Sequence, residues 1–422
     1  MTTPLAAPDG APGTDALDAR RADAARRLGD RLVLPAADEE VWRYSRIAEV
    51  DPERWALPAP ASTVPGAVVE LLESLGHLAG AVVVHDGTVV AARLDDDLRD
   101  AGVVVGRAVD APGGIDALGS VVAEGPDVLT TLNDARCADP VLVHVPRGVV
   151  IGSPIVVVDW IGSDDVAVHP RLVVHLGEDA EATVLEWRGS ADVAALSLPV
   201  TEIDVERAAR LRHGVVQDRG PKVWELATTG ARVAADGSIA VAQAGLGCAY
   251  GRSRVDCRLE GRGASGDLDA VYFGTGSQTL DFRTFQLHDA PDTTSNLLFK
   301  GAVDDDSRSV YTGLIRVEKD ARGTNAFQTN RNLKLSDRAW ADSVPNLEIE
   351  TNDVRCSHAS TVGPIDEDQL FYLESRGVPT GIAERLIVSG FFDEVLERFP
   401  VPVAAARVRD SIAQRLLLGG SR

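Results

Sequence analysis

One residue separates Cys356 from His358 near the end of an acidic, strand-like segment, residues 345–358. In an extended chain, successive side chains point to opposite faces, so this spacing places the thiol and the imidazole on the same face. Such a pair could bind iron or zinc, or could relay a sulfur atom as a persulfide. Two ligands make an incomplete metal site, and a packed strand end without chemistry is the alternative interpretation.

Two further motifs indicate turns rather than chemistry. Residues 261–266 have the spacing G-x-G-x-x-G, but residues 268–273 then read as a strand, whereas a dinucleotide site requires a helix there. Residues 304–306 are three aspartates, which could suggest a metal site or the paired carboxylates of a polysaccharide-cleaving enzyme. Adjacent side chains of a strand diverge, so a solvated turn is the preferred interpretation of the three aspartates.

The chain also lacks a P-loop motif, so any ATP use is expected from another subunit.

The elements that must position these residues change type along the chain. After a disordered start over residues 1–15, residues 16–115 mix short helices and strands and are predicted to form a small α/β domain. They include a helix over 68–75 and a hairpin over 81–93, whose Asp86-Gly87 turn requires positive φ at both positions.

Residues 116–360 consist of short strand-like runs separated by Gly, Asp, Asn and Pro, which predicts a large β unit. Periodicity alone leaves a sandwich, a barrel and a β-solenoid open, because no fixed repeat length is found. From residue 361 to 422 the apolar spacing becomes helical and predicts a three-helix unit. Its apolar stripes need a surface to pack on, either within the chain or on a partner.

Composition restricts the partners and the compartment. Asp and Glu number 64 against 42 Lys and Arg, and the net charge of −22 opposes binding to nucleic acid or to an anionic membrane. No apolar run approaches the roughly 18 residues needed to span a bilayer. The four cysteines are too scattered for a disulfide framework, so a cytoplasmic location is expected.

The segment 345–377, PNLEIETNDVRCSHASTVGPIDEDQLFYLESRG, resembles the end of SufB/SufD proteins, a family of iron–sulfur cluster assembly scaffolds. The resemblance extends to residues 313–315, 328–330 and 386–400, with looser matches at 171–189 and at 40–44, where Trp42 is expected to anchor local packing. It implies a mainly β fold: a right-handed parallel β-helix core over 116–360, flanked by the N-terminal α/β domain and the C-terminal helical domain.

Two positions distinguish the branches of this family. SufB-like chains carry a cysteine directly after the glutamine that matches Gln328, and a glutamate directly after the histidine that matches His358. This chain has Thr329 and Ala359 there, which can neither carry sulfane sulfur nor ligate iron, so it is most similar to SufD. The resemblance then implies that His358, together with Cys356, lies at the contact with SufB and takes part in cluster assembly, with His358 as a possible metal ligand.

The resemblance also implies a non-catalytic scaffold with named partners. A SufB-like homologue and a SufC-like ATPase are expected, and ATP hydrolysis by the latter would drive a conformational change before clusters pass to apo-proteins. No cofactor is expected to bind the isolated chain tightly; a transient cluster or iron is expected at the interface with SufB. The SufC-like partner is predicted to dock on the C-terminal helices, at Leu370, Phe371, Arg376, Phe391 and Phe392.

Three alternative functions stay open at this point. The chain could be a self-contained homodimeric scaffold of the same family. It could be a β-helix hydrolase or lyase acting on polysaccharide, which would need a carboxylate pair in an aromatic-lined groove. It could also be a purely structural adaptor, in which His358 is a packed residue without a ligand role.

Overall fold

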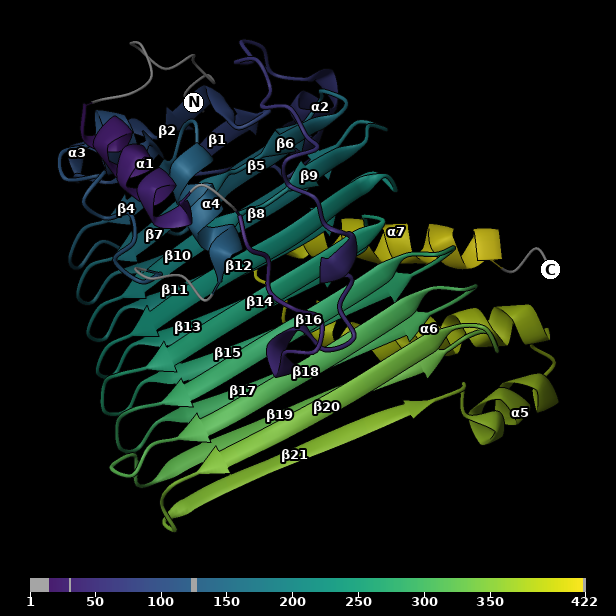
Figure 1. Cartoon of the computed structure of the whole chain (residues 1–422). Helices are drawn as coiled ribbons and strands as arrows, with labels where there is room; N and C mark the ends of the chain where they lie inside the picture. Colours follow the sequence, from purple (N-terminus) through teal and green to yellow (C-terminus); the bar gives the residue numbers. More distant parts are fainter. Residues whose placement is uncertain (1–14, 30–31, 123–126, 420–422) are drawn as a thin grey trace.

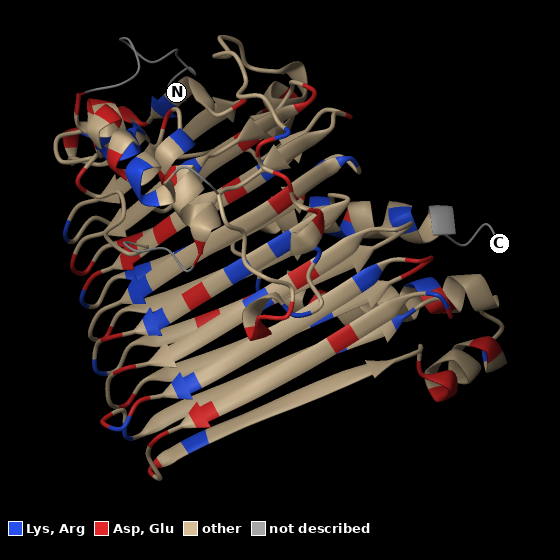
Figure 2. Cartoon of the chain, viewed as in Figure 1, with Lys and Arg blue, Asp and Glu red and all other residues tan. Residues whose placement is uncertain are grey.

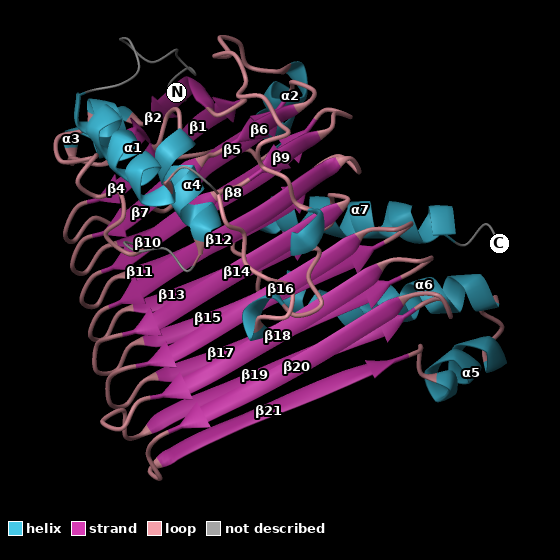
Figure 3. Ribbon diagram, in the orientation of Figure 1, coloured by secondary structure: helices cyan, strands magenta, loops and turns pink. Residues whose placement is uncertain are grey.

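The computed structural model describes residues 15–29, 32–122 and 127–419. Over these residues the chain winds into a parallel β-solenoid of about eight turns, whose two walls are a 10-stranded and an 11-stranded sheet (Figure 1). Helices occupy both ends of the chain (Figure 3). The predicted mainly β fold with a parallel β-helix core is therefore confirmed. The predicted disordered start lies outside the described residues except for Asp15, where the first helix begins.

The N-terminal region adds a hairpin to the solenoid. Its elements are α1 (Asp15–Leu28), η1 (Glu40–Trp42), η2 (Ile47–Glu49), α2 (Gly66–Ser74), β1 (Gly80–His85), β2 (Thr88–Leu94), α3 (Asp96–Asp100), β3 (Val104–Arg107), η3 (Ala108–Asp110) and α4 (Val128–Arg136). Asp86 and Gly87 have φ values of 50° and 79°, as the predicted turn requires. Strand β1 pairs antiparallel with β2 and parallel with β5, so the hairpin continues the 10-stranded sheet.

The solenoid strands alternate between the two walls. They are β4 (Val141–Val145), β5 (Ile155–Ile161), β6 (Val166–Val168), β7 (Arg171–Leu176), β8 (Glu181–Ser190), β9 (Ala195–Ser197), β10 (Val200–Val205), β11 (Arg210–Asp218), β12 (Val223–Val233), β13 (Ser238–Gly245), β14 (Tyr250–Leu259), β15 (Ser265–Gly274), β16 (Thr279–His288), β17 (Thr294–Val303), β18 (Arg308–Val317), β19 (Thr324–Lys334), β20 (Trp340–Ile349) and β21 (Val354–Gly363).

The length of a coil varies because the turns vary. Register partners in successive coils lie 26 residues apart at Trp224 and Tyr250 but 32 apart at Arg308 and Trp340. This variation explains why the sequence has no fixed repeat length. The G-x-G-x-x-G motif begins in the turn between β14 and β15 and ends in the first two residues of β15, so a strand follows it, as predicted.

Parallel pairing in register stacks each side chain on those of the neighbouring coils. In β19, Ala326, Gln328, Asn330 and Asn332 are buried, whereas Phe327 and Arg331 between them are exposed. Alternate residues of a strand therefore face either the lumen or the outside of the solenoid. The upper lumen is apolar and aliphatic, as Val143, Val174 and Ile203 illustrate.

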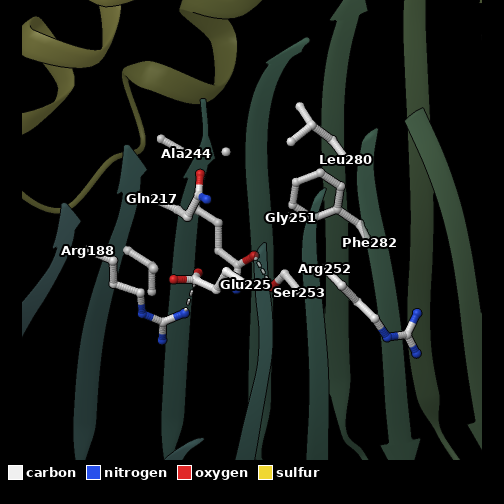
Figure 4. Close-up of a pocket in the computed structure, with 12 residues that line it drawn as sticks. Arg188, Gln217, Glu225, Ala244, Gly251, Arg252, Ser253, Leu280 and Phe282 are labelled. Atoms are coloured by element: carbon white, nitrogen blue, oxygen red, sulfur yellow. Dashed lines mark hydrogen bonds and ion pairs between the residues drawn. The ribbon is translucent and has the colours of Figure 1, made fainter. Parts of the chain in front are cut away.

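Charged side chains interrupt the apolar lumen at mid-height. Arg219 bonds to Asp159 and donates from Nε to Glu225 at 2.9 Å, and Arg188 donates from Nη2 to Glu186 at 2.7 Å. Arg188 also lies 3.5 Å from Glu225, beside a cavity of about 30 Å³ that is large enough for one or two water molecules (Figure 4). Each of these buried charges thus has a partner of opposite sign.

The two outer walls are covered by different parts of the chain. Helices α5 (Glu367–Ser375), α6 (Thr380–Leu396) and α7 (Pro402–Gly419) form the predicted three-helix unit, and α6 and α7 pack on the 10-stranded sheet (Figure 1). The N-terminal segment crosses the other wall. Trp42 is 3% exposed and is the packing anchor that was predicted. The Arg252 guanidinium carbon lies over the indole of Trp42, 3.9 Å from the ring centroid.

Acidic and basic residues are interspersed over strands and turns (Figure 2).

Replacement of Arg219 by leucine is expected to destabilise the protein by about 3–5 kcal/mol, because Asp159 would be left as a buried, unpaired charge and Glu225 would keep only its 3.5 Å contact with Arg188. The midpoint of urea unfolding measures this. The matched control is Arg262→Leu, which removes an exposed pair with Asp292 and should change stability by less than about 1 kcal/mol. Equal midpoints for the two variants would contradict the proposed role of the lumen charges.

Candidate functional site at the open end of the solenoid

Strands β20 and β21 are the last strands of the two sheets. Within the part of the chain that the structure describes, each has a neighbouring strand on one edge only, β18 and β19 respectively (Figure 1). The other edge of each strand presents unpaired N–H and C=O groups, a template for pairing with another chain. At the opposite end the sheets finish in the short antiparallel strands β2 and β3. Among the described strands, it is therefore the end formed by β20 and β21 that leaves parallel strand edges unpaired.

Cys356 and His358 lie on this last strand and face the lumen. In the register of β19 and β21, Cys356 pairs with Ala326 and His358 with Gln328. Ala326 and Gln328 are lumen residues, and residues in register share a face. The imidazole of His358 is exposed at the mouth of the lumen, while Cys356 is half-buried in a small apolar cluster with Ile315 and Ala326. The structure thus brings the two predicted site residues together.

The environment of Cys356 does not activate its thiol. Burial raises the pKa of the Cys356 thiol, although a backbone hydrogen bond from Ala326 opposes the shift. Nucleophilic cysteines have lowered pKa values, because the thiolate is the reactive species. In addition, no group of three or more His, Cys, Asp and Glu side chains among the described residues could hold a metal ion. Cys356 and His358 would therefore need ligands from outside the chain to complete a metal or cluster site.

The two positions that the family resemblance predicts to differ between SufB-like and SufD-like chains lie side by side. Thr329 and Ala359 are register partners in β19 and β21, one residue beyond Gln328 and His358. By alternation their side chains face the outside of the solenoid. The sequence places these positions thirty residues apart, and only the coil register makes them neighbours.

Gln328 is a site residue that the sequence interpretation passed over. Its side chain is 1% exposed, yet neither amide atom has a hydrogen-bond partner among the described residues. A buried amide without partners is unfavourable by roughly 1–3 kcal/mol on the scale of protein mutations. The available signal was the alternation of Gln328, Asn330 and Asn332, which puts amides on the buried face of a predicted strand.

The residues predicted to bind the SufC-like partner differ in exposure. Phe371 is 71% exposed on α5, Arg376 is exposed and stacks on Tyr372, and Leu370 is partly exposed. Phe391 and Phe392 behave differently: Phe391 is half-buried against Lys300, and Phe392 is 1% exposed and packs on Phe273. Phe392 fills the core of this chain, so a docking surface would consist of the exposed residues around α5.

Glu186 and the three aspartates at 304–306 lack the features expected of a polysaccharide site. Burial alone would raise the pKa of Glu186, but the Arg188 guanidinium lowers it to about 2, whereas a glycosidase acid needs a raised pKa. Glu186 also lies inside the lumen. The three aspartates at 304–306 accept hydrogen bonds from Asp305 N, Gly276 N and Arg338 Nε respectively, so their carboxylates diverge in a turn, as predicted.

No helix in the described ranges has both the length and the apolar character needed to cross a membrane. Fold and site together define a parallel β-solenoid protein with Cys356 and His358 at one open end. Residues 160–391 match the SufBD core domain of the SUF system of FeS cluster assembly.

Similar proteins cover between 65% and 94% of the chain. An iron–sulfur cluster assembly SufBD family protein of Mycobacterium tuberculosis is 31% identical over 396 residues, 92% of this chain and 90% of its own. A SufBD family protein of Synechocystis is 25% identical over 429 residues, 94% of this chain and 91% of its own. The chloroplastic protein ABCI7 of Arabidopsis thaliana is 30% identical over 284 residues, 65% of this chain and 60% of its own. The chain therefore belongs to the SufBD family of iron–sulfur cluster assembly proteins.

Iodoacetamide should label Cys356 before the other three cysteines, since Cys137, Cys248 and Cys257 are buried. Its reaction should have a pH midpoint above the ordinary thiol value of about 8.5, because burial raises its pKa. Mass mapping after timed alkylation measures both. Cys257, whose pKa burial raises to about 12, is the internal control and should react only after unfolding. A Cys356 midpoint below about pH 8 would show an activated thiol and contradict the inert state inferred from its burial.

Proposed function

We propose that this chain is the SufD-like subunit of a cytoplasmic scaffold that contains a SufB-like homologue and a SufC-like ATPase. The scaffold assembles iron–sulfur clusters and passes them to apo-proteins, and this subunit itself catalyses no reaction. The observation that carries the proposal is the open end of the solenoid, where His358 and Cys356 lie beside two unpaired strand edges.

The residues at this end favour SufD over SufB. Thr329 and Ala359 occupy adjacent places where a SufB-like chain would have a cysteine and a glutamate. A hydroxyl and a methyl group supply neither a sulfur carrier nor an iron ligand. This chain would therefore contribute a partial set of ligands, chiefly His358, to a site that the SufB-like subunit completes.

The exposed edges support pairing between two homologous solenoids. Two such ends placed together would satisfy the unpaired backbone groups of β20 and β21 and would enclose the mouth of the lumen. A cluster or iron ion, as the cargo of the scaffold, would then bind between His358 of this chain and ligands of the SufB-like subunit. The same edges would also permit a homodimer, which is the alternative scaffold.

The exposed face of the C-terminal helices supports docking of the ATPase. Phe371, Tyr372 and Leu386 are all more than half exposed, and α5 has no buried residue. An apolar patch of this kind on a folded chain marks a protein interface. In this proposal ATP binding and hydrolysis in the SufC-like partner move these helices and thereby the open end.

Co-expression with SufB-like and SufC-like proteins of the same organism is expected to yield a complex with one copy of this chain, one SufB-like chain and two SufC-like chains. Native mass determination measures the stoichiometry. A homodimer of this chain that binds neither the SufB-like nor the SufC-like protein would contradict the SufD assignment and favour the self-contained scaffold. Phe371→Ser separates the two interfaces, because it should release the SufC-like partner on this chain while the SufB-like partner stays bound.

In the assembled complex, His358→Ala is expected to lower the yield of reconstituted cluster by at least about tenfold while the stoichiometry stays unchanged, because a ligand at the junction is lost. Visible absorbance per complex and acid-labile sulfide measure the yield. Ser360→Ala is the matched control, since Ser360 lies on the same face of β21, two residues further along. Equal cluster yields in all three proteins would assign His358 a purely structural role.

A further inference from the structure

Inside the last coils, buried polar groups remain without hydrogen bonds. Both amide atoms of Gln328 in β19 and both of Gln286 in β16 lack a partner among the described residues, and both side chains are 1% exposed. The lumen charges at mid-height, by contrast, are paired. Native proteins rarely leave buried amides unsatisfied, so each such group requires an explanation.

The two glutamines differ in what lies next to them in register. Gln286 pairs with Cys257 and with Ile315, and Ile315 separates it from Leu347 in the last strand β20. Gln328 pairs with Leu297 on one side and with His358 on the other. In a parallel sheet the side chains of register partners share a face, about 4.8 Å apart at the backbone. The free amide of Gln328 is therefore the buried polar group next to the site imidazole.

On the opposite wall, the amide of Gln328 fills the space beside a glycine. A Cβ on Gly313 would lie 2.4 Å from Nε2 of Gln328 and 2.2 Å from the hydroxyl of Tyr311, so only glycine fits at this point of β18. The Tyr311 hydroxyl is already bonded to Thr284, at 3.0 Å. Gln328 thus occupies a space without a side chain opposite it, and its amide is not held in place by hydrogen bonds.

We propose that Gln328 is a positioning residue, whose amide hydrogen-bonds the imidazole of His358 when a partner subunit closes the open end. The inference rests on the proposed function, because it requires that His358 binds the cluster or iron. A glutamine amide can accept from a ring N–H or donate to a bare ring nitrogen. By holding one ring nitrogen it fixes the tautomer and directs the other nitrogen toward the cargo.

This role and a packing role predict opposite outcomes for Gln328→Met. Methionine has a similar volume and no amide, so removal of an unsatisfied buried group should leave stability unchanged or raise it. If the amide positions His358, the yield of cluster in the complex should nevertheless fall by about three- to tenfold, the effect of one lost hydrogen bond. The midpoint of the pH profile of cluster formation should also move by about half a unit or more.

Gln286→Met is the matched control, because it removes the other unpartnered lumen amide without touching His358. It should match Gln328→Met in stability but leave the yield and the pH profile unchanged. Wild-type yield and pH profile in Gln328→Met, in a complex where His358→Ala lowers the yield, would overturn the inference and leave the proposed function intact. No effect of His358→Ala would instead overturn the proposed function.

A second substitution tests the same inference if the Gln328→Met variant fails to fold. Gln328→Leu also removes the amide and is expected to give the same three- to tenfold loss of cluster in an intact complex. If both variants fail to fold while Gln286→Met folds, the amide is required for the structure of the last coils, and the positioning role is overturned.

Discussion

The in-register parallel ladder between successive coils is the constraint on which the rest of the structure depends. Because the ladder fixes which residue lies beside which, a side chain in one coil meets side chains about thirty residues away in sequence, as Gln328 meets His358. It also fixes the face, so lumen residues stack on lumen residues through the whole molecule. A slip of one residue would exchange the lumen and outer sets of a strand, and burial of Arg188, Arg219 and Glu225 would then fail.

The lumen contains two kinds of buried polar group, and their difference separates structure from function. At mid-height Asp159, Arg219, Glu225 and Arg188 neutralise one another, and each charge requires the others to remain buried. Near the open end, Gln286 and Gln328 have no such partners among the described residues. The first arrangement is self-contained and specifies register. The second lacks partners among the described residues, and of the two glutamines only Gln328 has His358 as a register partner.

Local features of the fold were predictable from the sequence, whereas the arrangement of the walls was not. The hairpin at Asp86-Gly87 and the three C-terminal helices follow from turn chemistry and apolar spacing, which act over a few residues. The solenoid required the family resemblance, because coils of 26 to 32 residues have no fixed period. The spacing of Cys356 and His358 was enough to place both on one face. Gln328 and Thr329 became neighbours of the site only through register between coils, which no local pattern encodes.

The position of the C-terminal helices relative to the open end follows from the same ladder. Lys300 in β17 binds Glu394 at 2.6 Å and the carbonyl oxygen of Phe391 at 2.8 Å, which ties α6 to this strand. In register, Lys300 is followed by Arg331 in β19 and by Thr361 in β21. Two strand spacings, about 10 Å, therefore separate the attachment of α6 from the strand that carries His358. In the proposed scaffold, a movement of the helices by a partner would therefore be passed to the site across two rows of backbone hydrogen bonds.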